Sequence, residues 1–326
     1  MYNTSTQRRF WVLESHEAIQ EAQITANTNF IEQRRKQTSN QNHTGEFLTH
    51  KEENVLITYY AKSVYDLCRK FRPPVPMGVM GTALMYFKRF YLHTSVMEFH
   101  PQYVAFLSVY LACKVDEYVV SIDQFMGQVM SAPNANIQMF IIDNELLLIQ
   151  KLTFHLTVHS PFRPMEGLII DLKTSSEGTG IENIEQYRQQ AEKFLHKSLL
   201  TDVGLLHTPS QIAMTALYCA IGKPFTNYLR HIAQEEANLE KLLNKIETIK
   251  SAVVNFRFPS ESEVKGVEAK VEICRDEEND PFSELYHARE NSRKEAKEMQ
   301  KKKQYQELRD MQEDEVKMLA YVSDGE

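Results

Sequence analysis

Apolar residues recur along this chain at the three- and four-residue spacing of helices, and the alternation expected of strands is absent between Thr49 and Val158. The clearest run starts at Pro101 and is apolar on nearly every face of a helix. A helix that is apolar all round is buried by other helices. The run ends in three charged residues, Lys114, Asp116 and Glu117. The pattern predicts a buried central helix whose C-terminal end reaches the surface.

A second copy of this pattern lies between Thr208 and Gly222. When Pro209 is set against Pro101, small residues fall on one stripe of both copies: Ala105, Ser108 and Ala112 in the first, and Ala213, Ala216 and Ala220 in the second. Two copies about a hundred residues apart indicate two similar helical domains in tandem. The copies differ where Lys114 of the first is matched by Gly222 of the second, so only the first domain can use this lysine.

Helix starts, helix stops and changes of composition divide the chain into five parts. We expect an N-terminal extension with one helix (1–48), a first five-helix domain (49–160), a second such domain (161–258), a C-terminal helix (259–280) and a charged tail (281–326) that is either a solvated helix or disordered. Thr49 with Glu52, and Ser260 with Glu263, have the spacing of capping boxes. The predicted fold class is all-α, two tandem five-helix boxes with extra N- and C-terminal helices.

Some boundaries are predicted in more detail. In the second domain, Ile184–Leu206 and Tyr228–Phe256 are each expected to form one continuous helix. Polar or turn-forming residues predict irregular segments at 38–45, 133–136 and 174–180.

Composition narrows the possible functions. The chain has 326 residues, 42% of them hydrophobic and 25% charged, as in globular proteins with a full core. A formal net charge of −7 argues against duplex DNA as the main partner, because phosphate contacts need clustered Lys and Arg. The four cysteines form no CxxC pair, which predicts buried thiols rather than a zinc ribbon or disulfides. No run approaches 18 apolar residues and the first residues lack an apolar signal core, so we expect neither export nor membrane association.

Signals for an enzyme or a cofactor are weak. No Walker loop occurs, and Gly178-Thr179-Gly180 lacks the third glycine and the preceding strand of a dinucleotide site. His155 and His159 have the spacing of helical zinc ligands, but Pro161 follows too soon for a continuing helix. We therefore expect no cofactor and no metal.

Lys114 and Glu145 each interrupt a helix that is otherwise apolar. Because an unpaired buried charge costs several kcal/mol, each needs a partner. One interpretation is that they pair with one another inside the first domain. The other is that they meet at a surface and hold a helix end or backbone polar groups of a second protein through charge-assisted hydrogen bonds.

Two segments carry a resemblance to a known family. LACKVDE ends the third helix of the first domain, and NELLLIQKLTFHL forms its fifth helix. Together with the tandem domains, they resemble the cyclin family over roughly residues 50 to 255. Three further segments are similar to one branch of this family, the cyclins of the CDK-activating kinase: GTALMYFKRFYLHTSVMEFHP, VHSPFRPMEGLIIDLKT and LTDVGLLHTPSQIAMTA.

The resemblance implies a regulatory, non-catalytic subunit located in the nucleus. Its implied partners are a cyclin-dependent kinase, a RING-finger assembly factor and the TFIIH core. The implied complex phosphorylates activation loops of other cyclin-dependent kinases and the C-terminal repeats of RNA polymerase II. Matching residues in cyclins contact the kinase near its αC helix, which assigns kinase binding to Lys114, Glu145 and Glu117 in this chain.

The resemblance also implies a regulatory phosphorylation at Ser5, for which an unmodified serine in a polar segment is the alternative. The first helix, NVLITYYAKSVYDLC, lacks the Met-Arg-x-x-Leu pattern and the tryptophan with which cell-cycle cyclins recruit substrates. Lys301, Lys302 and Lys303 are either an import signal or solubilising charges. Two other functions remain open: a cyclin of the Mediator kinase, and a nucleic-acid-binding initiation factor built from cyclin-like repeats.

Overall fold

The computed structural model describes residues 2–37, 47–130, 134–174 and 183–323, with side chains described as far as residue 312. All regular elements in these ranges are helices, which confirms the predicted all-α class. The chain forms two compact units, Met1–Arg275 and Asp276–Glu326, which are described separately. Of the expected irregular segments, 38–45, 175–180 and residue 133 lie outside the described residues. The prediction is wrong at Thr174, which ends the helix Phe162–Thr174, and at residues 135–136, which begin the helix Ala135–Lys151.

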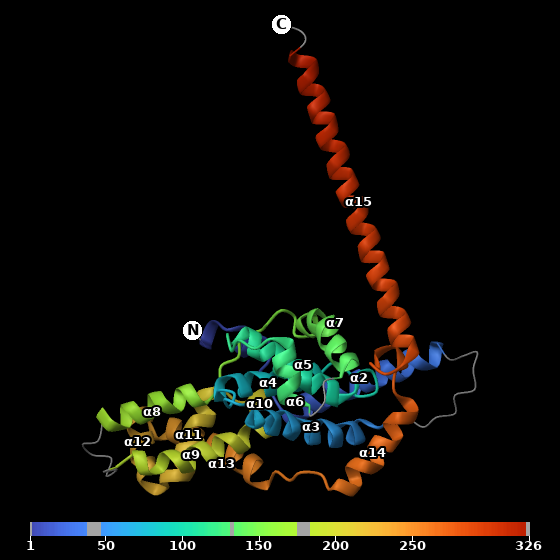
Figure 1. Cartoon of the computed structure of the whole chain (residues 1–326). Coiled ribbons are helices and arrows are strands. Elements are labelled where there is room, and N and C mark those ends of the chain that lie inside the picture. The colour runs from blue at the N-terminus through green and yellow to red at the C-terminus, as the bar shows by residue number, and fades with distance from the viewer. Residues whose placement is uncertain (1, 38–46, 131–133, 175–182, 324–326) are drawn as a thin grey trace. The chain divides into compact units, whose positions relative to one another are not determined.

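The first box consists of five helices (Figure 1): α3 (His50–Lys70), α4 (Met77–Phe90), α5 (Pro101–Val115), α6 (Ile122–Val129) and α7 (Ala135–Lys151). Helix α5 is the predicted central helix, and its residues are buried from Pro101 to Cys113 apart from Gln102 and Phe106. Its Tyr103 ring lies 5.5 Å from the ring of Phe140 on α7, and its Tyr110 ring 5.2 Å from Phe125 on α6. The expected position of this helix at the centre of the box is confirmed.

The second box contains α8 (Phe162–Thr174), α9 (Glu185–Leu200), the short α10 (Val203–Leu206), α11 (Pro209–Ile221), α12 (Lys223–Ala233) and α13 (Glu236–Asn255). Helix α11 is the repeat of α5, and Ala213 and Ala216 of its small stripe are fully buried. They belong to a continuous apolar core with Leu195 of α9, Phe225 of α12 and Ile249 of α13. The tandem repeat therefore produces two boxes, each with its own central helix.

Two predicted helices of the second box are wrong in their continuity. The segment 184–206 is broken at Thr201, whose extended backbone ends α9 before α10 begins. The expected helix Tyr228–Phe256 is two helices, because Gln234 adopts a left-handed φ of 61° between α12 and α13. Helix α12 also starts earlier than predicted, at Lys223, directly after Gly222 with its φ of 79°.

Helices outside the boxes pack on them. Helix α2 (His16–Gln37) begins after Ser15, whose Oγ accepts a hydrogen bond from Ala18 N at 3.3 Å. Helix α14 (Glu261–Cys274) packs along α3, where Glu268 accepts hydrogen bonds from Tyr60 Oη at 2.8 Å and from His100 Nε2 at 3.0 Å. Both predicted capping boxes, at Thr49 and Ser260, are present.

A short N-terminal segment links the two boxes. It contains a 3₁₀ turn (Tyr2–Thr4) and the five-residue helix α1 (Thr6–Phe10), which sequence patterns did not predict. Gln7 is buried and bonds the backbone of His159 in the linker, with 2.6 Å from His159 N to Gln7 Oε1. Farther along, Leu13 N donates to Leu205 O of the second box at 2.7 Å. The segment thus fixes the linker and the second box at once.

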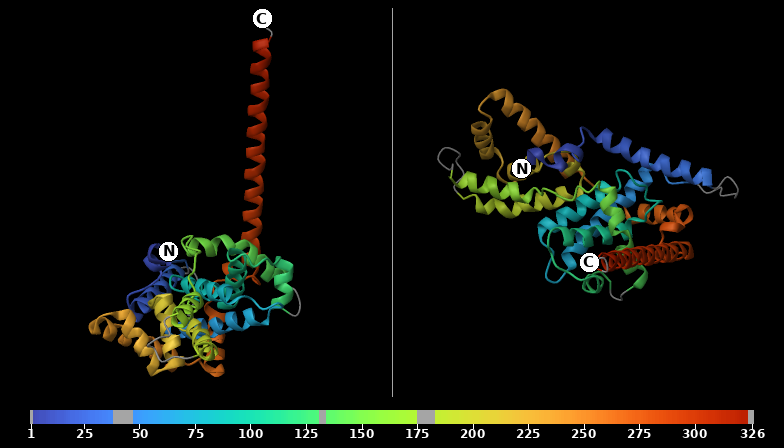
Figure 2. Two further views of the ribbon diagram at one scale, coloured as in Figure 1. Left: turned by 90° about the vertical axis from the view of Figure 1, so that its left-hand side faces the viewer. Right: turned by 90° about the horizontal axis from the view of Figure 1, so that it is seen from above.

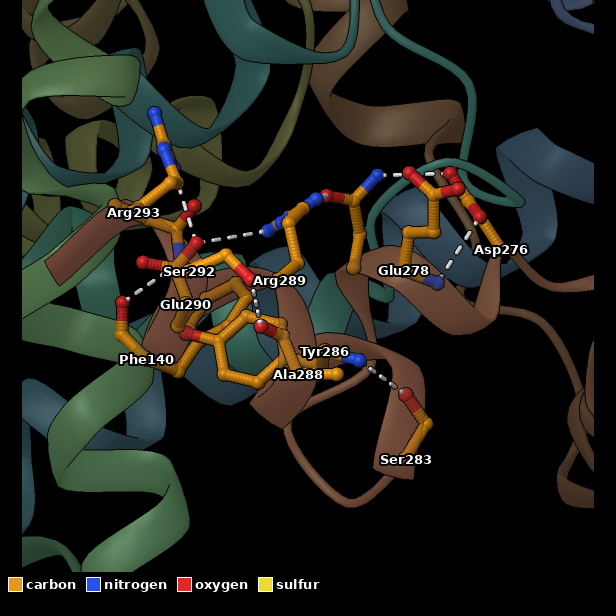
Figure 3. A network of polar contacts seen from close by, with 12 residues as sticks. Phe140, Asp276, Glu278, Ser283, Tyr286, Ala288, Arg289, Glu290, Ser292 and Arg293 are labelled. Atoms are coloured by element: carbon orange, nitrogen blue, oxygen red, sulfur yellow. Dashed lines mark hydrogen bonds and ion pairs between the residues drawn. The ribbon is translucent and has the colours of Figure 1, made fainter. Parts of the chain in front are cut away.

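The second unit contains a 3₁₀ turn (Glu277–Asn279) and α15 (Glu284–Ser323), a single helix of 40 residues (Figure 2). A polar network holds its start, as Figure 3 shows: Tyr286 N donates to Ser283 Oγ at 3.0 Å, and Arg293 donates to Glu290 Oε1 at 2.9 Å. Of the two alternatives for the tail, the structure shows the helix.

Candidate partner-binding surface

Lys114 and Glu145 form an ion pair at the surface of the first box. Lys114 Nζ lies 2.8 Å from Oε1 and 2.7 Å from Oε2 of Glu145, so it donates to both carboxylate oxygens. The side chain of Lys114 is 45% exposed and that of Glu145 is 23% exposed. The residues therefore pair with one another, as the first interpretation predicts, but they do so at the surface of the first box and not inside it.

The local sequence explains this position. Lys114 lies in the last turn of α5, where a positive charge is favoured by the helix dipole. Its Nζ lies over the Tyr110 ring one turn earlier, 4.8 Å from the ring centre, so the ammonium group makes a cation–π contact while the side chain stays 45% exposed. Glu145 comes from the middle of α7, which packs against α5.

Exposed apolar side chains surround the glutamate on its own helix. Ile142 is 52% exposed and Leu146 is 59% exposed, within one turn of Glu145. Phe154, just after α7, is 65% exposed and has a left-handed φ of 60°. Ordered apolar side chains around a charged pair are typical of a protein interface rather than of a solvated helix face.

The ion pair itself contributes little to folding. Partly exposed pairs of this kind are worth about 0–1 kcal/mol, because water screens the charges. The pair can therefore be broken or reoriented by a partner at small cost.

Glu117, the third residue assigned to kinase binding by resemblance, lies two residues beyond α5. It is exposed and has a φ of 58°, and its N–H donates to Lys114 O at 3.3 Å. It therefore follows Lys114 in the turn that ends α5, but its carboxylate makes no ion pair within the described part of the chain.

Ser5, the residue singled out for modification, is the N-cap of α1. Its Oγ accepts from Arg8 N at 3.3 Å and donates to Tyr2 O at 2.7 Å. Phosphorylation of this oxygen would remove the hydrogen bond donated to Tyr2 O, whereas the phosphate oxygens could still accept from Arg8 N.

The two histidines with metal-ligand spacing are used otherwise. His155 Nδ1 accepts a hydrogen bond from Trp11 Nε1 at 3.2 Å, and His159 bonds Gln7 through its backbone. Within the ranges that the structure describes, no cluster of three or more His, Cys, Asp or Glu side chains could hold a metal, and no helix could cross a membrane.

The sequence patterns did not predict that charged residues such as Arg89 and Glu53 would be buried. Arg89 is fully buried in α4; its guanidinium stacks 4.9 Å from the Trp11 ring, and burial lowers its pKa to about 10. Glu53 of α3 accepts hydrogen bonds from Ser95 Oγ and Val96 N, and burial raises its pKa to about 7. Glu53 lies among polar residues at the start of α3, and Arg89 lies beside Lys88 in the last turn of α4, where basic residues are common, so only the long-range contacts reveal their burial.

Comparison with known proteins agrees with this architecture. The family model described as the cyclin N-terminal domain matches residues 19–157, and that of the cyclin C-terminal domain matches residues 160–254. The chain is 37% identical over 288 residues to cyclin-H of Xenopus laevis, covering 85% of this chain and 88% of that protein. It is 32% identical over 239 residues to cyclin-H1-1 of Arabidopsis thaliana, covering 70% and 68%.

Solved structures with a similar fold come from two kinase complexes. A chain of the CAK complex from Chaetomium thermophilum, bound to ATP-gamma-S, superposes with a TM-score of 0.79 at 24% identity, covering 90% of this chain and 94% of that one. A chain of the yeast TFIIK (Kin28/Ccl1/Tfb3) complex gives a TM-score of 0.62 at 26% identity, covering 77% and 100%. With two tandem boxes, matches to both cyclin domain models and this identity to a cyclin H, the chain belongs to the cyclin H branch of the cyclin family.

Proposed function

We propose that this chain is the non-catalytic cyclin subunit of a CDK-activating kinase, acting alone or within TFIIH. The observation that carries the proposal is the surface described above, an ion pair between Lys114 and Glu145 beside exposed Ile142 and Leu146. Relatives of this chain are cyclin H proteins, and one solved structure with the same fold is a subunit of yeast TFIIK.

The proposed mechanism is a shift between two states of the kinase. An active kinase needs the ion pair between its β3 lysine and its αC glutamate. A partner that binds better to the state with αC in place shifts the population toward that state. Lys114, Glu145 and Glu117 supply charged groups for helix-end or backbone contacts, and the apolar residues of α7 supply buried area. The kinase carries out the phosphoryl transfer.

Further elements of the proposal follow from the family. The other partners are a RING-finger assembly factor and the TFIIH core, and the complex acts in the nucleus. Its substrates are activation loops of cyclin-dependent kinases and the C-terminal repeats of RNA polymerase II.

Ser5 is proposed as a phosphorylation site that regulates the N-terminal segment. Neither DNA nor a membrane is a direct partner of this chain. A cyclin of the Mediator kinase is the alternative, distinguished by which kinase co-purifies with the tagged chain.

Charge reversal tests the surface directly. Lys114→Glu or Glu145→Lys should weaken binding of the kinase subunit by about 2–3 kcal/mol, roughly 30- to 150-fold, since one charge of the contact becomes repulsive. Isothermal titration with the purified kinase measures this change. The melting temperature of the free chain should hardly change, because the exposed pair contributes little to folding.

The double variant Lys114→Glu/Glu145→Lys separates the two roles of the pair. It restores the ion pair within the chain but presents inverted charges to the kinase, so binding should stay weak. Recovery of normal affinity would show that the pair acts only within the first box. Lys173→Glu is the matched control, because Lys173 forms a similarly exposed pair with Glu185 in the second box.

A further inference from the structure

Helix α15 exposes large apolar side chains along much of its length. From residue 291 to residue 312 every side chain is exposed. Tyr305 is 75% exposed, Leu308 is 60% exposed and Met311 is 66% exposed. Most helical stability in proteins comes from packing of an apolar stripe on a neighbour, since an isolated helix is only marginally stable in water. This stretch of α15 is therefore suited to a helical partner.

One stripe of the stretch has the alternating three- and four-residue spacing of a coiled-coil seam. We call this stripe the α15 seam and define it by six exposed residues: Lys294, Lys297, Lys301, Gln304, Leu308 and Met311. The seam is basic in its first half and apolar in its second half. Met299 lies two residues from both Lys297 and Lys301, so it is on the opposite face of the helix.

Charges along the whole helix follow the same division. Residues 289–303 contain seven basic and three acidic residues, whereas residues 304–315 contain one basic and five acidic residues in the sequence. A parallel pair of such helices would place like charges together, which is unfavourable. An antiparallel pair places each basic half on an acidic half, and a two-fold axis produces this match twice.

The seam also has a matching register in the antiparallel orientation. When Gln304 of one copy lies opposite Leu308 of the other, Lys301 lies opposite Met311. The aliphatic stem of a lysine covers apolar surface while its ammonium group stays at the edge. Lys301 can therefore pack on Met311 and reach the acidic residues on either side of it. The apolar half of each seam is covered by the basic half of the other.

We propose that α15 is a self-association surface, on which two copies of this chain pair antiparallel along the α15 seam. The occupant is a second copy because one helix carries both complementary halves, in the order that antiparallel pairing requires. The residues of the seam are separate in sequence from those of the proposed kinase contact.

Disulfide trapping tests the orientation. Full-length Lys301→Cys and Met311→Cys chains are prepared separately, mixed and oxidised, and the products are identified by mass. A disulfide should form only in the mixture, because the two positions face each other. Two copies of the same position would be ten residues apart along the axes, about 15 Å, and a disulfide spans at most about 7 Å between Cα atoms.

Met299→Cys is the matched control for trapping and should crosslink with neither chain, because it is on the opposite face. The unsubstituted chain, with its four native cysteines, should also stay uncrosslinked. Disulfides within each single variant but not in the mixture would show a parallel pair and overturn the proposal. The absence of a disulfide from every sample would overturn it as well.

Sedimentation equilibrium of the full-length chain tests the charges. Lys297→Glu/Lys301→Glu should weaken the association by about tenfold or more, and raising the salt from about 50 mM to about 500 mM should weaken the wild-type association. Lys302→Glu/Lys303→Glu makes the same change of charge outside the seam and should have a much smaller effect. Equal losses in the two double variants would contradict pairing along the seam.

Removal of the apolar half tests the packing. Leu308→Ser/Met311→Ser should be monomeric, whereas Met299→Ser should associate like the wild type. Circular dichroism of each variant at dilutions where the wild type is monomeric checks that the helix is retained. A wild-type chain that is monomeric at every concentration, or a dimer that survives Leu308→Ser/Met311→Ser, would overturn the proposal. Lys114→Glu should leave self-association unchanged, so this proposal and the kinase contact are tested separately.

Discussion

The two central helices, α5 and α11, begin alike and end differently. Both have proline at their first position and a side-chain N-cap, from His100 in α5 and Thr208 in α11. Helix α5 carries Lys114 in its last turn and is followed by a charged turn that reaches solvent, whereas α11 is followed by Gly222, whose φ of 79° turns the chain directly into α12. The shared small stripe maintains the packing of each box, and the last turn decides whether the box presents a charged surface.

The largest effect on the free energy of unfolding is expected from matched cavity-forming substitutions in the two cores. Leu148 of α7 and Leu217 of α11 are both fully buried, so Leu148→Ala and Leu217→Ala should each cost about 2–5 kcal/mol of unfolding free energy. Because residues 1–275 form one compact unit in which Lys88 of α4 donates to Thr201 O of the second box, either variant should lower one common transition. Differential scanning calorimetry that resolves two separate transitions would show that the boxes unfold independently.

A second comparison uses one buried titratable group from each box. Glu53 in the first box has a pKa raised to about 7 by burial, so its stabilising contribution is lost as pH rises from about 4.5 to 7. His207 in the second box has a pKa lowered to about 4, first by burial and then by the charge of Lys245, so its contribution is lost as pH falls from about 6.5 to 4. As pH rises, the two groups therefore change the free energy of unfolding in opposite directions.

Single variants should therefore unmask opposite pH dependences. Between pH 5 and 6.5, Glu53→Gln should become more stable with rising pH by about 2 kcal/mol, and His207→Gln should become less stable by a similar amount. The wild-type chain should change little over this range. Urea titrations at four pH values measure these slopes. Parallel slopes in the two variants would mean that other groups control the pH response.

The smallest effect is expected at one position of the small stripe. Ser108 of α5 is fully buried and its hydroxyl has no hydrogen-bond partner within the described residues, while Ala216 occupies the matching place in α11. A buried hydroxyl without a hydrogen-bond partner lowers the stability of the fold, because it has lost its bonds to water. Ser108→Ala should therefore raise the free energy of unfolding by about 1 kcal/mol. The reverse change, Ala216→Ser, should lower it by about 1–3 kcal/mol. A thermal melt of each variant checks the signs, and a loss on Ser108→Ala would indicate a bridging water.

Local patterns predicted the helices and their caps because local interactions create them. The capping boxes at Thr49 and Ser260 need only a residue and its third neighbour, and the burial of α5 follows from its continuous apolar run. The break at Gln234 was missed, since glutamine has no preference for a left-handed φ and tertiary packing imposes it. The five residues of α1 are too few for a stable isolated helix, so this helix depends on long-range contacts of Gln7 and Trp11.

The candidate surface was predictable in its residues but not in its surroundings. Lys114 and Glu145 stand out as charges within apolar helices, and the structure brings them into contact. The exposure of Ile142 and Leu146 was not predictable, because a helix that is apolar on all its faces is expected to be buried on all of them.

Helix α15 has a mechanical consequence of its own. From residue 291 to residue 312 every side chain is exposed, so this stretch is supported by its own backbone hydrogen bonds and by pairs such as Gln306 with Asp310. At 1.5 Å per residue, its 40 residues extend about 60 Å. Two proteins bound at the base and near the tip of a straight helix of this length would be held at a set distance from each other. Shortening the helix by whole turns would change that distance in steps of about 5.4 Å.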